Sequence, residues 1–373
     1  MIEFHDVSKT FAGRPAASHL NLNFAEGAFS VLIGTSGSGK STTVKMINRL
    51  VEHDSGLIRF AGEEIRSLPV LELRRRMGYA IQSIGLFPHW TVAQNIATVL
   101  QLEKWSRTKI AERVDELMAL LGLEPALRDR YPHQLSGGQQ QRVGVARALA
   151  ANPQVLLMDE PFGAVDPINR ETIQNEFLDM QRQLKKTVML VSHDIDEALK
   201  LGDRIAVFRQ GKIVQNASAD ELLARPANDF VASFVGQDRT LKRLLLVQAG
   251  DVADQQETVT VRRETPLVEA FGLMDDIDAR SVTVVDADGK PLGYVKRREA
   301  RGAPGVCADS LHHFRVTARA EENLRVVLSK LYEHNTSWMP IVDEDGRYSG
   351  EISQDYIADY LSSGRTRRVL TPQ

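Results

Sequence analysis

The sequence has almost no cysteine, and it has no long run of apolar residues. Cys307 is the single cysteine among 373 residues, which excludes an internal disulfide and suits a reducing compartment. We expect its side chain to be inert and partly buried. No stretch of about 18 uncharged apolar residues occurs, and no basic segment precedes an apolar one near Met1. The chain is therefore expected to be neither secreted nor membrane-spanning.

The chain also lacks a strong charge of either sign. Its formal net charge is −3, which argues against nucleic acid as a partner. Any anionic partner has to be recognised by a local patch instead. The length of 373 residues exceeds what one hydrophobic core supports, so it predicts two or three domains.

A glycine-rich loop stands between an apolar run, residues 29–33, and a helical pattern, residues 42–51. The loop and the residue after it are Gly34, Thr35, Ser36, Gly37, Ser38, Gly39, Lys40, Ser41 and Thr42. The spacing predicts a P-loop, in which backbone N–H groups close on phosphate and a helix N-terminus adds positive charge. Lys40 is expected to reach the β- and γ-phosphates, and Ser41 to hold Mg²⁺. The alternative is a glycine-rich turn that binds nothing.

Two further residues, one before and one after this loop in the sequence, have two interpretations each. Phe11 lies in a region of short predicted strands, and it is either a core aromatic or a ring that stacks on adenine. Gln82 ends a predicted strand that begins at Tyr79. It is either a ligand of Mg²⁺ or water, or an ordinary loop glutamine.

A helical pattern follows Gln82 and predicts a helical subdomain at about residues 83–148. A helix start in this subdomain carries Ser136, Gly137, Gly138 and Gln139. Two glycines at a helix N-terminus leave backbone N–H groups facing outward. We therefore expect a second phosphate-binding surface here.

Two later apolar runs are each followed by polar residues. Residues 155–158 read as a buried parallel strand, and Asp159 and Glu160 follow directly. One carboxylate is expected to hold Mg²⁺ and the other to accept a proton from an attacking water. The alternative is two solvated acids in a turn. His193 follows the next run and is either a capping or buried histidine, or a sensor of the γ-phosphate.

The order of these motifs resembles the nucleotide-binding domain of ABC transporters, an α/β P-loop fold, over residues 1–236. The motifs are the P-loop, Gln82, Leu135 to Gln139 (LSGGQ), Asp159-Glu160, Asp166 and His193. The resemblance implies ATP and Mg²⁺ as ligands and a head-to-tail dimer. Each site then takes Ser136, Gly137, Gly138 and Gln139 from the second chain. It also implies that Glu160 is the general base and that Asp166 links the two sites.

Three further segments, residues 84–89, 161–167 and 238–243, resemble the ATPase subunits of importers for osmoprotectants such as glycine betaine and choline. This resemblance implies a peripheral subunit at the cytoplasmic face of the cell membrane, served by a permease and, indirectly, by a substrate-binding protein. Residues 87–90 are then expected to contact the permease, with core packing as the alternative. An ATPase touches no transported substrate, so an importer of another small molecule, such as an amino acid, stays open.

The second half of the chain repeats itself with a period of 57 residues. Val285-Asp286 recurs as Val342-Asp343, and Gly293 recurs as Gly350. The pattern resembles a tandem CBS pair with α+β repeats at 259–302 and 303–362, after a linker at 237–258 and before a basic tail at 363–373. A unit this small cannot bury a core alone, so the two are expected to pack together.

The pair departs from the adenosine-binding pattern of CBS repeats. Lys296 and Glu299 stand where the first repeat would carry Ser/Thr and Asp, and Ser353 and Tyr356 stand at the equivalent positions of the second. Gly302, Pro304 and Gly305 are expected to break the closing helix of the first repeat. These departures argue against a standard adenosine site.

A basic cluster remains at the end of the first repeat: Lys296, Arg297, Arg298 and Arg301. It is either a solvated face or a surface that meets an anionic lipid or an anionic ligand such as a nucleotide. Salt would screen such a contact, so ionic strength could gate the pump. A pair that serves only dimerisation is the further alternative.

Overall fold

The structure is a computed structural model that describes residues 1–80, 85–163, 167–253 and 259–363. The chain divides into two compact units, Met1–Gly236 and Gln237–Gln373. Among the described residues, no helix is both long and apolar enough to cross a membrane. The two units are described separately.

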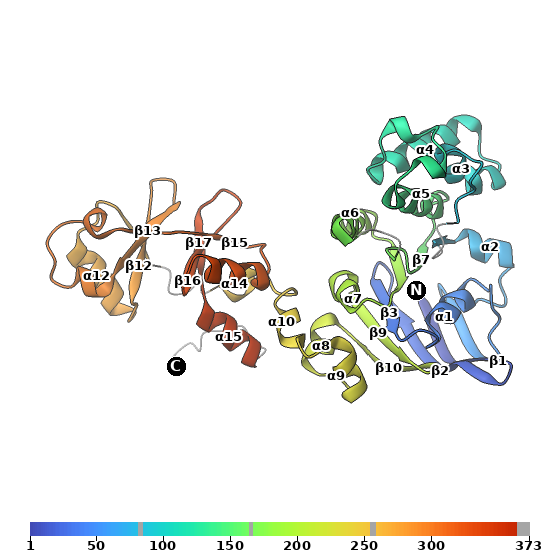
Figure 1. Ribbon diagram of the computed structural model, residues 1–373, viewed down its shortest axis with the longest axis horizontal. Coiled ribbons are helices and arrows are strands. Elements are labelled where there is room, and N and C mark those ends of the chain that lie inside the picture. The colour runs from blue at the N-terminus through green and yellow to red at the C-terminus, as the bar shows by residue number, and fades with distance from the viewer. Residues whose placement is uncertain (81–84, 164–166, 254–258, 364–373) are drawn as a thin grey trace. The chain divides into compact units, whose positions relative to one another are not determined.

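The first unit is built on a six-stranded sheet with the order β10-β9-β3-β8-β7-β6 (Figure 1). Its strands are β3 (Phe29–Gly34), β6 (Met77–Ala80), β7 (Val155–Asp159), β8 (Thr187–Val191), β9 (Arg204–Arg209) and β10 (Lys212–Ala217). All are parallel except β10, which pairs antiparallel with β9. Every residue of β3, β7 and β8 is buried, as expected for central strands covered on both faces.

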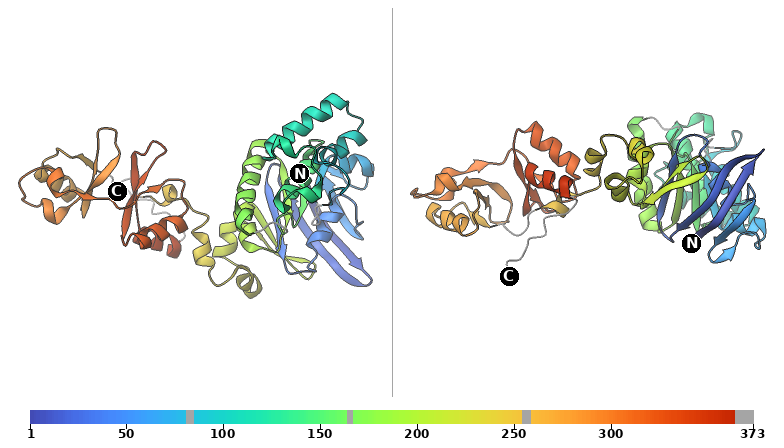
Figure 2. Two further views of the ribbon diagram at one scale, coloured as in Figure 1. Left: turned by 45° about the horizontal axis from the view of Figure 1, so that its top comes forward. Right: turned by 90° about the horizontal axis from the view of Figure 1, so that it is seen from below.

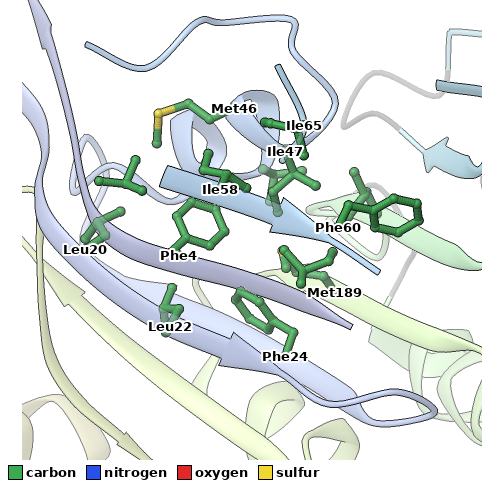
Figure 3. Close-up of a cluster of buried hydrophobic side chains, with 14 of the residues drawn as sticks. Phe4, Leu20, Leu22, Phe24, Met46, Ile47, Ile58, Phe60, Ile65 and Met189 are labelled. Carbon is green, nitrogen blue, oxygen red and sulfur yellow. The ribbon is translucent and has the colours of Figure 1, made fainter. Parts of the chain in front are cut away.

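A four-stranded antiparallel sheet lies beside it, with the order β2-β1-β4-β5 (Figure 2). It consists of β1 (Ile2–Phe11), β2 (Arg14–Phe24), β4 (Ser55–Phe60) and β5 (Glu63–Glu64). Alternating residues of β1 and β2 face inward and pack with residues of α1 (Lys40–Ile47) and of the larger sheet (Figure 3). This core fixes the helix that starts in the glycine-rich loop.

Helices cover the larger sheet and form a separate layer (Figure 1). The layer consists of α3 (Val92–Leu102), α4 (Arg107–Leu120) and α5 (Gly137–Leu149), with the 3₁₀ turns η1 (Pro125–Leu127) and η2 (Pro132–Gln134). The other helices are α2 (Val70–Arg75), α6 (Pro167–Leu184), α7 (Ile195–Leu201), α8 (Ala219–Ala224) and α9 (Asp229–Val235). The helix predicted over residues 42–51 is α1, which begins two residues earlier and ends at Ile47, because Arg49 is left-handed with φ 52°.

The second unit holds two sheets. The first is β11-β12-β13-β14, made of β11 (Thr260–Arg262), β12 (Ser281–Val285), β13 (Pro291–Lys296) and β14 (His312–His313). The second is β15-β16-β17, made of β15 (Ala318–Arg319), β16 (Trp338–Val342) and β17 (Tyr348–Ser353). The helices are α12 (Leu267–Asp276), α13 (Arg297–Ala300), α14 (Leu324–Glu333), α15 (Gln354–Ser363) and the 3₁₀ turn η3 (Cys307–Ser310). The closing helix of the first repeat is confirmed as broken, since α13 ends at Ala300.

The segment expected to be a linker, residues 237–258, is instead folded where it is described. It forms α10 (Arg239–Arg243) and α11 (Ala249–Val252). Leu244, Val247 and Ala249 are buried in one cluster with residues of α14, β16 and β17. The segment therefore completes the core of the second repeat. Cys307 is fully buried in the core of the first repeat, where burial raises the pKa of its thiol.

Candidate nucleotide site

The glycine-rich loop leaves β3 at the carboxyl end of the larger sheet and leads into α1. Two of its glycines are required by close approach. A Cβ on Gly34 would lie 2.2 Å from the Phe208 carbonyl oxygen, and a Cβ on Gly39 would lie 2.1 Å from the Ala16 carbonyl oxygen. Gly39 also has φ 104°, a region that favours glycine. The loop is thus packed closely against its neighbours at these two positions.

Lys40 is buried inside this loop. Its Nζ donates to the carbonyl oxygens of Gly34 at 2.9 Å and Thr35 at 3.0 Å. Burial lowers the pKa of the ammonium, whereas Glu160 and Asp159 oppose that shift. Within the part of the chain that the structure describes, this buried cation is bonded to carbonyl oxygens alone, so it is well placed to gain from an anion, since such a pair is stronger at low dielectric.

Ser41 and Asp159 meet across the sheet edge. The Ser41 hydroxyl donates to Asp159 Oδ1 at 2.9 Å, and Asp159 is buried at the end of β7. Burial raises the pKa of Asp159, and the hydrogen bond from Ser41 partly opposes this. Burial and the nearby Asp159 also raise the pKa of Tyr79 to about 12. A hydroxyl and a carboxylate oxygen side by side fit Mg²⁺, which binds through one or two protein oxygens together with phosphates.

Glu160 and His193 face each other from neighbouring strand ends. His193 Nδ1 lies 3.4 Å from Glu160 Oε2, and the imidazole is mostly exposed. The backbone of Glu160 is left-handed, with φ 48°, and its N–H donates to the Val191 carbonyl oxygen at 2.9 Å. Such a conformation costs about 1–3 kcal/mol. Because β3, β8 and β7 are adjacent, the P-loop, His193 and the two carboxylates meet at one edge.

The second predicted phosphate-binding surface is the start of α5. Ser136 caps the helix: its Oγ accepts from the Gln139 backbone N–H at 3.2 Å, and the Gln139 side chain accepts from the Ser136 N–H at 3.0 Å. In the described part of the chain, these bonds stay within the first turn, and α5 packs on α3, α4 and β6. Ser136 and Gly137 are exposed, with Gly138 and Gln139 half-buried. The structure therefore presents this surface outward on the helical layer.

Three other predicted site residues have different outcomes. Phe11 is 47% exposed, so its interpretation as a core aromatic is wrong, and stacking on a base stays a prediction. Its ring lies 5.2 Å from Lys9 Nζ. Gln82 and Asp166 lie outside the described residues, so their expected roles stay predictions.

Comparisons with known proteins agree with this geometry. The ABC transporter family model matches residues 17–163, and the CBS domain model matches residues 249–304 and 313–363. The osmoprotectant import ATP-binding protein OsmV of Salmonella typhimurium is 66% identical over 376 residues, covering 99% of this chain and 98% of that protein. The chain belongs to the ATP-binding proteins of ABC transporters. As a member of this family, it binds and hydrolyses ATP.

Other ABC proteins are similar to all or part of the chain. The glycine betaine/carnitine/choline transport ATP-binding protein OpuCA of Bacillus subtilis is 42% identical, over 97% of this chain and 96% of that protein. A bacterial ABC transporter cassette solved as a dimer is 34% identical with a TM-score of 0.54, covering 59% of this chain and 99% of the other. The same cassette bound to ADP and phosphate after hydrolysis gives 32% identity and a TM-score of 0.53, with the same coverage.

The helical layer of this ABC ATPase exposes an aromatic loop. Phe87 is 43% and Trp90 37% exposed, with ring centroids 4.6 Å apart, so core packing is the wrong interpretation for these two rings. Asn95, fully buried in α3, accepts from the Phe87 N–H at 2.8 Å and donates to the carbonyl oxygens of Phe87, Trp90 and Thr91. Nothing in the sequence singles out Asn95, because an asparagine in a helix usually faces solvent.

The CBS unit of the ABC ATPase contains a cavity of 1040 Å³ that both repeats line. Five basic residues line it: Arg280, Lys296, Arg297, Arg298 and Arg301. Phe271, Tyr294 and Trp338 add aromatic rings. The basic cluster is thus not simply a solvated face, since four of its members share a concave surface with a second repeat.

Acidic residues neutralise part of this charge. Arg297 pairs with Asp275 and Asp278, while Glu299 accepts from His312 at 2.6 Å and lies near Lys296 and Arg298. Among the described residues, Arg280 and Arg301 form no ion pair. The positive charges of those two arginines are therefore available to bind an anion in the cavity.

Proposed function

We propose that this ABC ATPase drives an importer for osmoprotectants such as glycine betaine, choline or related quaternary amines. The observation that carries the proposal is the 66% identity to an osmoprotectant import protein across 99% of the chain, CBS unit included. In this proposal the chain supplies the energy of ATP hydrolysis, and the partner subunits recognise the substrate.

In the proposed cycle, the P-loop and Lys40 bind the phosphates of ATP. Ser41 and Asp159 would hold Mg²⁺, which neutralises charge on the phosphate oxygens. Glu160 accepts the proton of the attacking water, and His193 contacts the γ-phosphate. These roles fit groups that the strand ends bring together.

The proposed site needs a second copy of the chain. Ser136, Gly137, Gly138 and Gln139 of that copy would close over the P-loop, with the backbone N–H groups at the start of α5 facing phosphate. The outward-facing start of α5 supports this, and so does the dimer formed by the solved cassette. Closure of the dimer would then be transmitted to the permease through Phe87 and Trp90, two exposed rings held by Asn95. The proposal places the ATPase peripherally at the membrane.

Cells that lack this chain should lose uptake of labelled glycine betaine or choline at high osmolarity. The wild-type chain should restore uptake, because ATP hydrolysis drives the importer. The Glu171→Gln variant should restore it equally, since Glu171 is exposed and pairs only weakly with Lys200 at 3.6 Å. Unchanged quaternary-amine uptake together with lost amino-acid uptake would favour the other importer class.

For the CBS unit we propose a regulatory site for a phosphate-bearing anion, either a lipid headgroup or a nucleotide. The support is the cavity, which three aromatic rings and two arginines line, Arg280 and Arg301, neither of which forms an ion pair in the described part of the chain. The proposal does not depend on the residues of the standard adenosine-binding pattern. Glu299, which stands at one of those positions, already accepts a hydrogen bond from His312. Contacts of this kind weaken as salt rises, which would report ionic strength.

The double variant Arg280→Ala/Arg301→Ala should bind phosphatidylglycerol vesicles roughly thirtyfold more weakly, at about 1 kcal/mol per arginine. Vesicle sedimentation at low and high potassium chloride measures this, with phosphatidylcholine as the neutral surface. Arg347→Ala is the matched control, because Arg347 lies in an exposed hairpin outside the cavity. Binding of AMP alone would identify a free nucleotide, and no binding of either would leave dimerisation as the role of the pair.

A further inference from the structure

A buried polar cluster lies directly behind His193. Glu197 of α7 is 6% exposed, and its carboxylate accepts from Gln174 Nε2 of α6 at 3.1 Å. The backbone N–H of Glu197 donates to Asp194 Oδ1 at 3.3 Å, and the hydroxyl of Ser192, which is 2% exposed, lowers the pKa of the carboxylate. Glu197 therefore joins the segment around His193 to a helix of another part of the fold.

This carboxylate is costly to bury. Burial raises the pKa of Glu197 and nearby Asp194 adds to the shift, whereas the hydrogen bonds from Ser192 and Gln174 and the charge of Arg170 lower it. An apolar side chain would fill the same space without that cost. A polar group kept in such a place is typical of a position where geometry matters more than stability.

The cluster fixes both neighbours of His193. The Ser192 N–H donates to the Leu32 carbonyl oxygen at 3.0 Å, on the strand that delivers the P-loop. The Asp194 N–H donates to Ser192 Oγ at 3.0 Å, and Asp194 Oδ1 accepts from the backbone N–H groups of Asp196 and Glu197. Arg170 of α6 lies 3.6 Å from Asp194 Oδ2. Only the imidazole between them faces outward toward Glu160.

We propose that Glu197 is a positioning residue, which ties residues 192–194 to α6 and thereby holds the His193 imidazole beside Glu160. The inference rests on the proposed contact of His193 with the γ-phosphate. It adds that the placement of this imidazole depends on α6. The connection to α6 runs through Gln174, whose side chain donates directly to the Glu197 carboxylate.

Glu197→Gln tests the proposal without changing the size of the side chain. The variant replaces one carboxylate oxygen by an amide N–H group, so a donor faces Gln174 or the surroundings of Ser192 where the wild-type chain has an acceptor. We expect kcat for ATP hydrolysis to fall about tenfold, within the range that a misplaced group costs, with KM for ATP changing less than about twofold. The swapped pair Glu197→Gln/Gln174→Glu restores a carboxylate–amide contact and should recover most of the rate. Glu171→Gln, on the exposed side of α6, is the control.

A double-mutant cycle separates positioning from general stability. In a His193→Ala background, Glu197→Gln should lower kcat by less than about twofold, because both changes act on one imidazole. Losses that multiply would overturn the inference and leave the role of His193 intact. A His193→Ala variant with normal ATPase activity would overturn the proposed role of His193 and the inference with it. Melting temperatures of all variants show whether a loss of rate is only a loss of fold.

Discussion

Glu160→Gln is expected to lower the rate of ATP hydrolysis by about 10²- to 10⁴-fold, the usual contribution of a general base. The amide has the same shape as the carboxylate but cannot accept the proton of water. Because Lys40, Ser41 and Asp159 are untouched, ATP should still bind with nearly unchanged affinity. Steady-state phosphate release and equilibrium binding of a fluorescent ATP analogue measure the two effects.

The same variant should accumulate as a dimer in the presence of ATP, because closed sites no longer hydrolyse the nucleotide that holds them. Size-exclusion chromatography with and without ATP shows this. Glu171→Gln provides a matched loss of one carboxylate from an exposed position and should stay at the wild-type rate. A Glu160→Gln variant that hydrolyses ATP normally would show that another group takes the proton.

The P-loop could be predicted because its chemistry restricts residue types at fixed spacing. Gly34 and Gly39 tolerate no side chain, since carbonyl oxygens of Phe208 and Ala16 approach them so closely. The strand before the loop can also be predicted from the sequence, because β3 is buried on both faces and therefore consists of one apolar run. Spacing of this kind survives in the sequence without any knowledge of the fold.

Buried polar residues could not be predicted. Asn95, Gln174 and Glu197 are residue types that usually lie at the surface, and nothing local distinguishes them from solvated ones. Their burial depends in part on partners beyond the local turn, such as Phe87, 8 residues from Asn95, and Glu197, 23 residues from Gln174. The sequence leaves Phe11 with two interpretations, because an aromatic in a strand pattern packs inward only if another layer covers it.

In the second unit, the period of 57 residues predicts that two repeats exist. Proline and glycine residues predict separately that one helix is broken, as the structure confirms. The period did not show that residues before the first repeat complete the core of the second. Leu244 and Val247 reach that core through tertiary packing, which sequence spacing does not encode. The cavity between the repeats has the same origin, since Arg280 and Trp338 come from different repeats.

Lys40→Met and Ser136→Arg are each expected to lower ATPase activity by more than about 10²-fold, as loss of a single group that stabilises developing charge does. Lys40→Met removes the buried cation next to the phosphates. Ser136→Arg places a bulky side chain on the exposed surface at the start of α5, at a stability cost of about 1 kcal/mol for the lost helix cap. Lys40 lies in the P-loop and Ser136 in the helical layer, so a dimer made of one variant alone carries the same defect in both of its sites.

Mixing these two inactive variants tests whether each ATP site is shared by two chains. In a mixed dimer, one site carries both substitutions and the other carries neither. If the sites are shared, ATPase activity reappears on mixing, well above that of either variant alone, and it follows the fraction of mixed dimers. A mixture that stays as inactive as its components, although mixed dimers are shown to form, would contradict a shared site.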